Sequence, residues 1–276
     1  MAKSNNIYEQ VYNISEDPSL FSRVDHVICI LLQRGLLVAG FSNTKQLLAL
    51  NYTGCNKTKP VWELSFFEHL FMQEPLLAVK EKIKGVFVLG NKNLIVPEAL
   101  YEKKQAENWL RNIHFIERGD VINTYPLKET KASYLLALPV HITELIRINF
   151  KKAITLPLPF YQFGNISKQG AYAQCCITAE QVTATLHNNG QLLWHQVFDY
   201  AAAEDIAYTI MQVCTGNNIP QSGLSLRCNA ISATEYSIIN GLSQYFPGIT
   251  PGNGGKFTNR WDGAIQLANQ LFSCVL

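Results

Sequence analysis

A glycine-rich run near the end of the chain has the composition of a phosphate-binding loop. It reads Pro251-Gly252-Asn253-Gly254-Gly255-Lys256. A P-loop needs glycine at its first position and serine or threonine directly after the lysine, because backbone N–H groups cradle the phosphates and the hydroxyl binds Mg²⁺. Thr250 and Phe257 stand at those two positions. We therefore predict a flexible turn here, followed by a final helix over residues 261–274.

Cysteine side chains are a second source of chemistry, as metal ligands or nucleophiles. The sequence has seven of them, with no CxxC or CxxxH pair, and the number is odd. Cys175 and Cys176 are adjacent in a predicted strand, where successive side chains point to opposite faces, so the two cannot share a metal ion. This usage is typical of reduced core thiols in the cytoplasm.

Two histidines, His187 and His195, lie in the two strands of a predicted hairpin. Asn189-Gly190 is a strong type I′ turn signal between apolar strands over residues 181–187 and 192–200. Counted outward from that turn, the regular pairing places the two histidines on opposite faces of the hairpin. We therefore predict that they do not share a metal ion, and that His195, on the apolar face, is a hydrogen-bonded structural histidine.

Several acidic residues are explained by helix capping. Glu204 and Asp205 lie in the first turn of a predicted helix, where they stabilise the positive end of the dipole. Ser232 and Glu235 have the spacing of a capping box. None of these carboxylates is assigned a catalytic role.

The elements that position these residues form a block that occurs twice: three short strands, a helix and a further strand. In the second half it comprises strands over residues 172–178, 181–187 and 192–200, a helix over 202–214 and a strand over 224–229. In the first half it comprises strands over residues 26–32, 36–42 and 46–53, a helix after Trp62 and a strand over 85–89. The repetition predicts two similar α/β lobes.

The segment between the two blocks has its own organisation. It predicts a helix over residues 97–112, a hairpin over 120–126 and 132–138, a helix over 140–150 and a strand over 153–156. We predict a first lobe over residues 1–165, with a helix-hairpin insertion at about 91–150, and a second lobe over residues 166–276.

This order of elements resembles the ribonuclease H-like unit that actin, sugar kinases and heat-shock-chaperone ATPases use in pairs. The runs VFVLGNKNLIVPEAL (residues 86–100) and GQLLWHQVFDYAAAEDIAYTI (residues 190–210) are similar to an uncharacterised bacterial domain family with an actin-like ATPase fold. The resemblance covers roughly residues 20–250. It implies an α/β fold of two ribonuclease H-like lobes in an actin-like arrangement, with mixed sheets flanked by helices, and implies no specific activity.

The resemblance also indicates where a nucleotide would bind. Active members hold it between the lobes, where the first hairpin turn of each lobe cradles phosphates and a nearby aspartate organises magnesium. The corresponding turns here read Gln33-Arg34-Gly35-Leu36 and Thr178-Ala179-Glu180-Gln181, and neither contains the Asp-x-Gly-x-Thr pattern. Phosphoryl transfer depends on metal and positioned donors that neutralise the transferring charge.

The candidate cleft residues that remain are few. They are Arg34 as an anion contact, Glu180 as a cation contact, and Gly35, Gly254 and Gly255 as loop glycines. The alternative is that Arg34 and Glu180 are solvated surface residues, as isolated charges at turns commonly are. No catalytic residue, metal ligand or cofactor is assigned.

The nuclease use of the same unit is also excluded by missing carboxylates. It needs several acids converging on two metal ions from the first strand, the helix and the fourth strand. The strands over residues 85–89 and 224–229 contain none. Asp25 and Asp199, at strand ends, are interpreted as turn or cap residues.

The amino-acid composition argues against nucleic-acid-binding, secreted and membrane-spanning proteins. Hydrophobic residues make up 47% of the 276-residue chain and charged residues 16%, with a net charge of +2 and no Lys/Arg run longer than two, so a nucleic-acid partner is not indicated. The amino terminus lacks the apolar core of a signal peptide. The longest apolar stretch, residues 27–41, is interrupted by Gln33-Arg34-Gly35 and is too short for a membrane helix. These features predict a cytoplasmic protein.

Three functions are compatible with these observations. The fold pattern without metal-binding acids favours a non-catalytic scaffold or adaptor that binds a protein partner or a second copy of itself. The alternative is a divergent ATP-binding enzyme or kinase that uses Arg34, Glu180 and the Gly252–Gly255 loop in a nonstandard cleft. A small-molecule binding module would require a polar pocket between the lobes.

Overall fold

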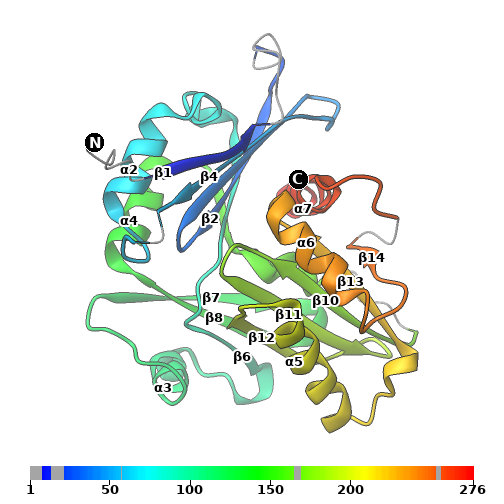
Figure 1. Ribbon diagram of the computed structural model, residues 1–276. Coiled ribbons are helices and arrows are strands. Elements are labelled where there is room, and N and C mark those ends of the chain that lie inside the picture. Colours follow the sequence, from blue (N-terminus) through cyan, green and yellow to red (C-terminus); the bar gives the residue numbers. More distant parts are fainter. Residues whose placement is uncertain (1–7, 14–21, 57, 165–168, 253–255) are drawn as a thin grey trace.

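The computed structural model describes residues 8–13, 22–56, 58–164, 169–252 and 256–276. Its strands form two large sheets and one small sheet, with helices packed against the large ones (Figure 1). Both predicted blocks of three strands, helix and strand are present, which confirms the predicted α/β class.

The first large sheet has the strand order β1-β4-β3-β2-β5-β9. These strands are β1 (Tyr8–Asn13), β2 (His26–Leu32), β3 (Gly35–Phe41), β4 (Leu47–Cys55), β5 (Ile83–Val88) and β9 (Ile154–Pro157). β3 is buried throughout and β2 is buried except at its first residue. Their almost uninterrupted apolar sequences are those of strands covered on both faces. The sequence analysis did not predict β1, which pairs antiparallel with β4 at the sheet edge.

Different helices cover the two faces of this sheet. Helices α2 (Leu64–Gln73) and α4 (Val140–Asn149) pack on the face that presents Cys29 and Leu31. Helix α7 (Asp262–Ser273) packs on the opposite face, where the rings of Phe41 and Phe272 stack with their centroids 4.0 Å apart. The alternation of side chains along β2 therefore supplies two separate apolar clusters.

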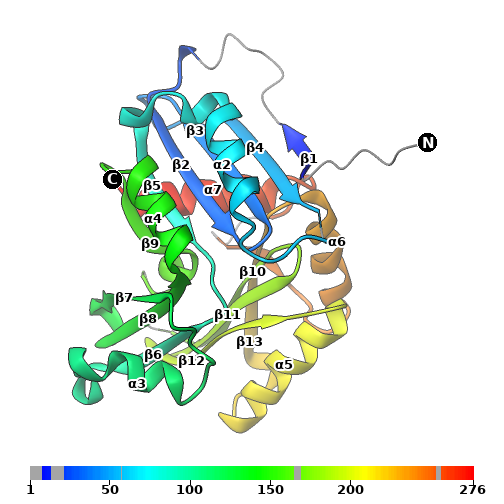
Figure 2. The same ribbon diagram turned by 90° about the vertical axis from the view of Figure 1, so that its left-hand side faces the viewer.

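The second large sheet has the order β12-β11-β10-β13-β14. These strands are β10 (Ala171–Ile177), β11 (Gln181–Asn188), β12 (Gln191–Asp199), β13 (Leu224–Ala230) and β14 (Thr250–Pro251). Helices α5 (Ala203–Gly216) and α6 (Ala233–Leu242) pack on its outer face. Helix α7 lies between the two large sheets, and one apolar cluster joins it to both (Figures 1 and 2).

The small sheet is built by the predicted insertion, with the order β6-β8-β7. The predicted hairpin is confirmed as β7 (Asp120–Leu127) and β8 (Ala132–Pro139). The helix predicted over residues 97–112 is wrong over residues 97–105. Strand β6 (Asn93–Pro97), which pairs with β8, ends at the predicted start of that helix, and short 3₁₀ turns follow. Only Ala106–Arg111 form an α-helix, α3.

The predicted pairing of the second-lobe hairpin is also wrong, because strand β12 contains a bulge. His187 pairs with Leu192 as expected, but Leu186 then pairs with Trp194, and Thr185 with His195. One extra residue moves every following side chain to the opposite face. His187 and His195 therefore lie on the same face.

Both histidines are packed against aromatic rings. His187 stacks on Tyr172 at a centroid distance of 4.8 Å, and the ring centroid of His195 lies 5.1 Å from that of Phe163 and 5.5 Å from that of Tyr134. Burial lowers the pKa of His187 to about 4 and the pKa of His195 to about 3. Both rings are therefore neutral at physiological pH. The predicted hydrogen bond of His195 is not found with ordinary geometry among the described residues, and its ring is held by aromatic packing.

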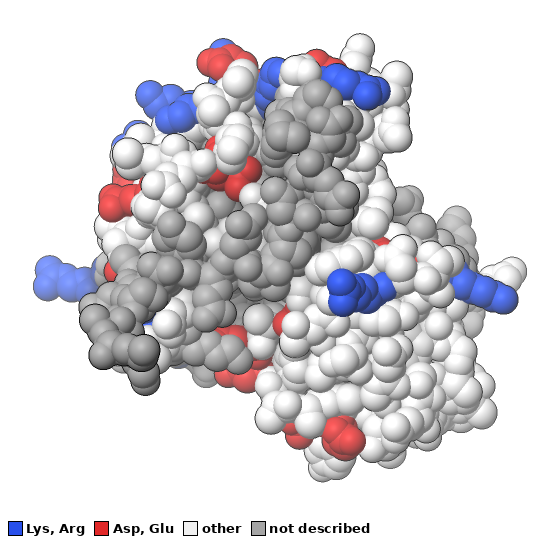
Figure 3. Space-filling view, turned by 45° about the horizontal axis from the view of Figure 1, so that its top comes forward, with Lys and Arg blue, Asp and Glu red and all other residues white. Residues whose placement is uncertain are grey.

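On the face shown in Figure 3, the described lysines and arginines stand apart from one another, with acidic side chains among them. No helix of the described residues is long and apolar enough to cross a membrane.

Candidate functional site

The first hairpin turns of the two lobes meet in the structure. In the first lobe the turn consists of only Gln33 and Arg34, because Leu32 at the end of β2 already pairs with Gly35 at the start of β3. In the second lobe the turn between β10 and β11 is closed by the Thr178 backbone N–H, which donates to the Gln181 carbonyl oxygen at 2.9 Å. Both turns are therefore tight.

The two charged candidates form an ion pair with each other. The Arg34 Nε atom lies 3.1 Å from the Glu180 Oε1 atom, and the two side chains are 19% and 32% exposed. The Arg34 Nη1 atom also donates to the Lys59 carbonyl oxygen. The guanidinium and the carboxylate thus neutralise each other across the lobe junction instead of standing free for an anion and a cation.

The candidate glycines have different outcomes. Gly35 lies opposite Gly54 on β4, and a Cβ atom added to Gly35 would lie 2.8 Å from the Tyr52 ring. Gly35 is therefore required so that the Tyr52 ring can pack against the turn. Gly254 and Gly255 lie outside the described residues.

The space enclosed between the two turns is small. It has a volume of about 20 Å³, and its walls include Arg34, Tyr52 and Glu180. A void of this size accommodates about one water molecule. A phosphoryl group does not fit between the turns while the ion pair is in place.

A larger cleft lies beside the ion pair, between the lobes. It has a volume of about 720 Å³, and the start of helix α6 forms part of its wall. Ser232, predicted as a helix cap, is the N-cap residue there, and its hydroxyl accepts a hydrogen bond from the Thr234 N–H at 3.1 Å. In the described residues no reciprocal bond to the Ser232 backbone completes the predicted capping box. Glu235 is 5% exposed and is hydrogen-bonded to Ser232.

Two carboxylates and two phenols line this cleft, together with the Arg34 guanidinium. Burial, with the Glu235 carboxylate as the next contribution, raises the pKa of both Tyr52 and Tyr200. The Tyr200 hydroxyl donates to the Thr178 carbonyl oxygen at 2.7 Å. Both phenols stay protonated, so the charged groups named so far in this cleft are Arg34, Glu180 and Glu235, with a net charge of −1.

The sequence analysis gave Glu235 and Ser232 a capping role and did not place them in a cleft. The available signal was their position directly after β13, because side chains at the carboxyl ends of neighbouring parallel strands meet at one sheet edge. β13 is parallel to β10, whose end leads into the turn that carries Glu180.

The described residues contain no group of three or more His, Cys, Asp or Glu side chains able to hold a metal ion. The two aspartates at strand ends make hydrogen bonds to segments distant in sequence, and that of Asp199 joins it to its cross-strand partner instead of a turn or cap. Asp25 accepts a hydrogen bond from the Asn43 N–H at 2.9 Å, and Asp199 accepts one from the Gln181 side-chain amide at 3.0 Å. Both stabilise local chain geometry.

Comparison with known proteins supports the fold. The family described as "Protein of unknown function (DUF3822)" matches residues 28–249. No curated protein matches the chain. A Bacteroides thetaiotaomicron protein of unknown function with an actin-like ATPase fold is similar, with a TM-score of 0.70 and 13% identity over 90% of this chain and 97% of that chain.

A second similar structure is a chain of the PilM-PilN type IV pilus biogenesis complex. It has a TM-score of 0.53 and 13% identity over 91% of this chain and 98% of that chain. Likeness at this identity concerns the fold alone. The predicted actin-like ATPase fold is thereby confirmed.

Proposed function

The chain belongs to the DUF3822 family of proteins of unknown function, and we propose that it is a non-catalytic scaffold or adaptor with an actin-like fold that binds a protein partner. The observation that carries this proposal is the ion pair between Arg34 and Glu180. It occupies the junction of the two turns that cradle phosphates in nucleotide-binding members of the fold.

Size and charge at this junction support the proposal. The enclosed volume of about 20 Å³ leaves no room for a phosphoryl group. Binding a triphosphate there would require breaking the ion pair and bringing the phosphates close to Glu180 and Glu235. Both carboxylates would repel the ligand unless a metal ion intervened.

Exposed apolar side chains support the protein-binding part of the proposal. Leu100, Ile113 and Phe115, in the insertion, are 58%, 61% and 83% exposed. Exposed apolar surface within one segment is typical of sites that contact other proteins. The PilM-PilN neighbour is itself a protein–protein complex. In this proposal the protein acts in the cytoplasm, without nucleotide or metal, and its lobes and insertion follow the predicted division of the chain.

The nucleotide arm of the proposal is tested by ATP turnover and thermal unfolding with millimolar ATP and Mg²⁺. We expect no magnesium-dependent turnover and no rise in melting temperature. Magnesium-dependent turnover that disappears in the Glu180→Gln variant would overturn the proposal.

The partner arm is tested on the insertion surface. The double variant Ile113→Ser with Phe115→Ser should reduce, by at least about 10-fold, the yield of proteins crosslinked to the full chain in cells, because apolar anchors dominate interface energies. Met72→Ser is the matched control, since Met72 is 86% exposed on α2 in the first lobe. Equal loss in both variants, or no loss in either, would argue against a partner at the insertion.

The second candidate is a divergent ATP-binding protein, and the interlobe cleft of about 720 Å³ favours it. In that case ATP with magnesium raises the melting temperature by mass action, by an amount that corresponds to about 2.7 kcal/mol at 100 times the Kd. Arg34→Gln then changes the nucleotide affinity. Under the scaffold proposal the same variant alters stability alone.

A further inference from the structure

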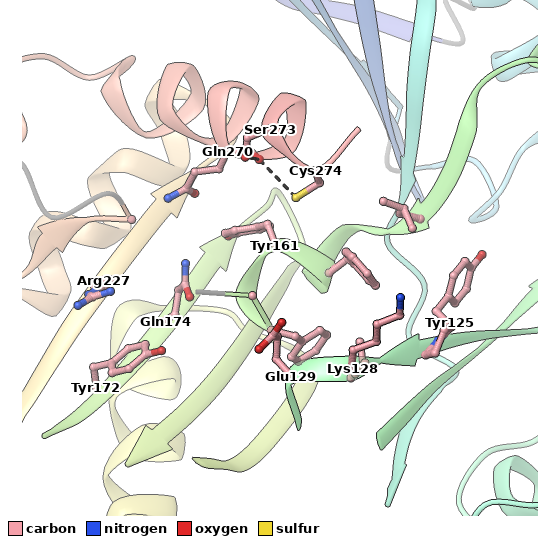
Figure 4. A pocket seen from close by; sticks show the side chains of 17 residues that line it. Tyr125, Lys128, Glu129, Tyr161, Tyr172, Gln174, Arg227, Gln270, Ser273 and Cys274 are labelled. Atoms are coloured by element: carbon pink, nitrogen blue, oxygen red, sulfur yellow. Dashed lines mark hydrogen bonds between the residues drawn. The ribbon is translucent and has the colours of Figure 1, made fainter. Parts of the chain in front are cut away.

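A separate cavity of about 640 Å³ lies where the first-lobe sheet, the insertion and the second lobe meet (Figure 4). It shares no lining residue with the interlobe cleft. Its volume is within the usual range of about 300–1,000 Å³ for small-ligand sites. Its position gives any occupant contacts with all three parts of the molecule.

One end of the cavity is rich in hydrogen-bond donors. Gln174 on β10 and Arg227 on β13 are register partners in neighbouring parallel strands, so their side chains project side by side into the cavity (Figure 4). The Arg227 guanidinium carbon lies 4.5 Å from the centroid of the Tyr172 ring. Among the described residues, no carboxylate lies within ion-pair distance of Arg227.

Gln174 adds an unused polar group at the same end. It is 7% exposed, and within the described part of the chain its side-chain amide makes no hydrogen bond. Its amide atoms are not among the fully buried unpartnered ones and face the cavity, so a ligand that removes them from water has to supply their hydrogen bonds. Across the cavity, the Gln270 Oε1 atom on α7 accepts from the Asn229 amide at 2.8 Å, which leaves the Gln270 amide nitrogen as a donor.

The charge of the cavity is positive. Its ionisable lining residues, apart from tyrosines and a cysteine, are Arg227, Lys128 and Glu129, which give two positive charges and one negative charge. Lys128 and Glu129 lie on the turn at the tip of the β7–β8 hairpin and are exposed. Arg227 is the half-buried one of the three, so its charge is screened least.

Apolar side chains form another part of the lining. Leu156 and Phe160 are half-buried and present open apolar surface, and Leu127 and Phe163, each 3% exposed, complete this wall. An aromatic or branched aliphatic group placed there removes apolar surface from water on both sides of the contact.

We propose that this cavity binds an apolar carboxylate, a ligand with an aromatic or branched aliphatic body and one carboxylate group. The carboxylate accepts hydrogen bonds from Arg227 and Gln174, and the body packs on Leu127, Phe160 and Phe163. The ligand is either a free small acid or the C-terminal residue of a polypeptide, because both present the same chemistry. This inference does not depend on the proposed scaffold function.

The experiment measures binding to the full-length protein by calorimetry and thermal shift. The probes are 4-phenylbutyrate for a free acid and N-acetyl-Leu-Phe for a chain terminus, each compared with its primary amide. We expect at least one acid to bind and its amide to bind at least about 10-fold more weakly, since a hydrogen bond to a charged group is the stronger kind. Preference for one acid over the other identifies the source.

Variants test whether binding occurs at this place. Arg227→Gln should weaken the binding of the acid at least about 10-fold, whereas Arg118→Gln, which changes an exposed arginine outside the cavity lining, should not. Equal binding of acid and amide, no binding of either acid, or equal affinity in Arg227→Gln and the wild type would overturn the proposal. If Arg227→Gln does not fold, the comparison of acid with amide on the wild type remains decisive.

Discussion

Lowering the pH from 8 to 5 should destabilise this protein through His187 and His195. His187 is fully buried, and the ring of His195 packs against that of Phe163. Burial lowers the pKa of His187 to about 4 and the pKa of His195 to about 3. An unfolded histidine has a pKa of about 6.5. Between these values the unfolded chain binds protons that the folded chain does not, so stability is lost as the pH falls below about 6.5.

The size of the effect follows from the same pKa values. A pH of 5 is about 1.5 units below the pKa of a histidine in the unfolded chain, so that histidine is protonated. In the folded protein both histidines are still neutral at this pH. The free energy of unfolding then falls by about 2 kcal/mol per histidine relative to pH 8, or about 4 kcal/mol for both. This is a large share of the roughly 5–15 kcal/mol by which most domains are stable.

The assay is urea unfolding at pH 8 and pH 5 for the wild type and for His195→Phe, which keeps an aromatic ring between Tyr134 and Phe163. The variant should lose about 2 kcal/mol less than the wild type between the two pH values. The difference between the proteins is compared because burial also raises the pKa of Glu74, which changes stability in the opposite direction in both.

Tyr134→Phe is the matched control. It alters the packing around His195, but burial raises the pKa of Tyr134 well above its ordinary range, so no proton is exchanged there between pH 5 and 8. The control should therefore change stability equally at both pH values. If His195→Phe retains the full pH dependence of the wild type, the assignment of that dependence to the buried ring is refuted.

Three further predictions concern packing and thiols. Gly35→Ala should destabilise the protein by about 1–3 kcal/mol in urea unfolding, because the new methyl group would lie 2.8 Å from the Tyr52 ring; an unchanged midpoint would contradict the described contact. Phe272→Ala should cost about 3–5 kcal/mol by the same measurement, and less than 1 kcal/mol would show that α7 does not cover the first sheet. Ellman's reagent at pH 8 should label native protein slowly, because burial raises the pKa of Cys176 to about 12 and that of Cys274 to about 11; rapid labelling would show that the thiols are accessible.

Much of the fold could be predicted because its signals are local. The apolar runs of β2 and β3, the Asn189-Gly190 turn and the N-cap at Ser232 each specify an element within a few residues. The predicted strands of both blocks lie within a few residues of those observed. Side-chain periodicity and turn chemistry act over short stretches, which is why they are readable from one sequence.

The features that could not be predicted depend on contacts between distant segments. β6 forms because β8 offers it a partner, and the bulge in β12 shifts His195 without a sequence signal as strong as the turn before it. The meeting of Arg34 with Glu180 depends on how the two lobes are placed. The sequence analysis identified both residues and their turns, and only the structure shows that they bind each other. The division of the chain near residue 165 stays a prediction.

The position of α7 has a consequence for how the chain folds. One face of the first-lobe sheet, which includes Phe41, is covered by a helix that is synthesised after every strand of that sheet. Contacts between segments so far apart in sequence close late, because the entropy of a long loop must be overcome first. During synthesis this face of the sheet is therefore exposed until α7 has been made. An exposed apolar face makes the nascent chain prone to aggregation or to binding by a chaperone.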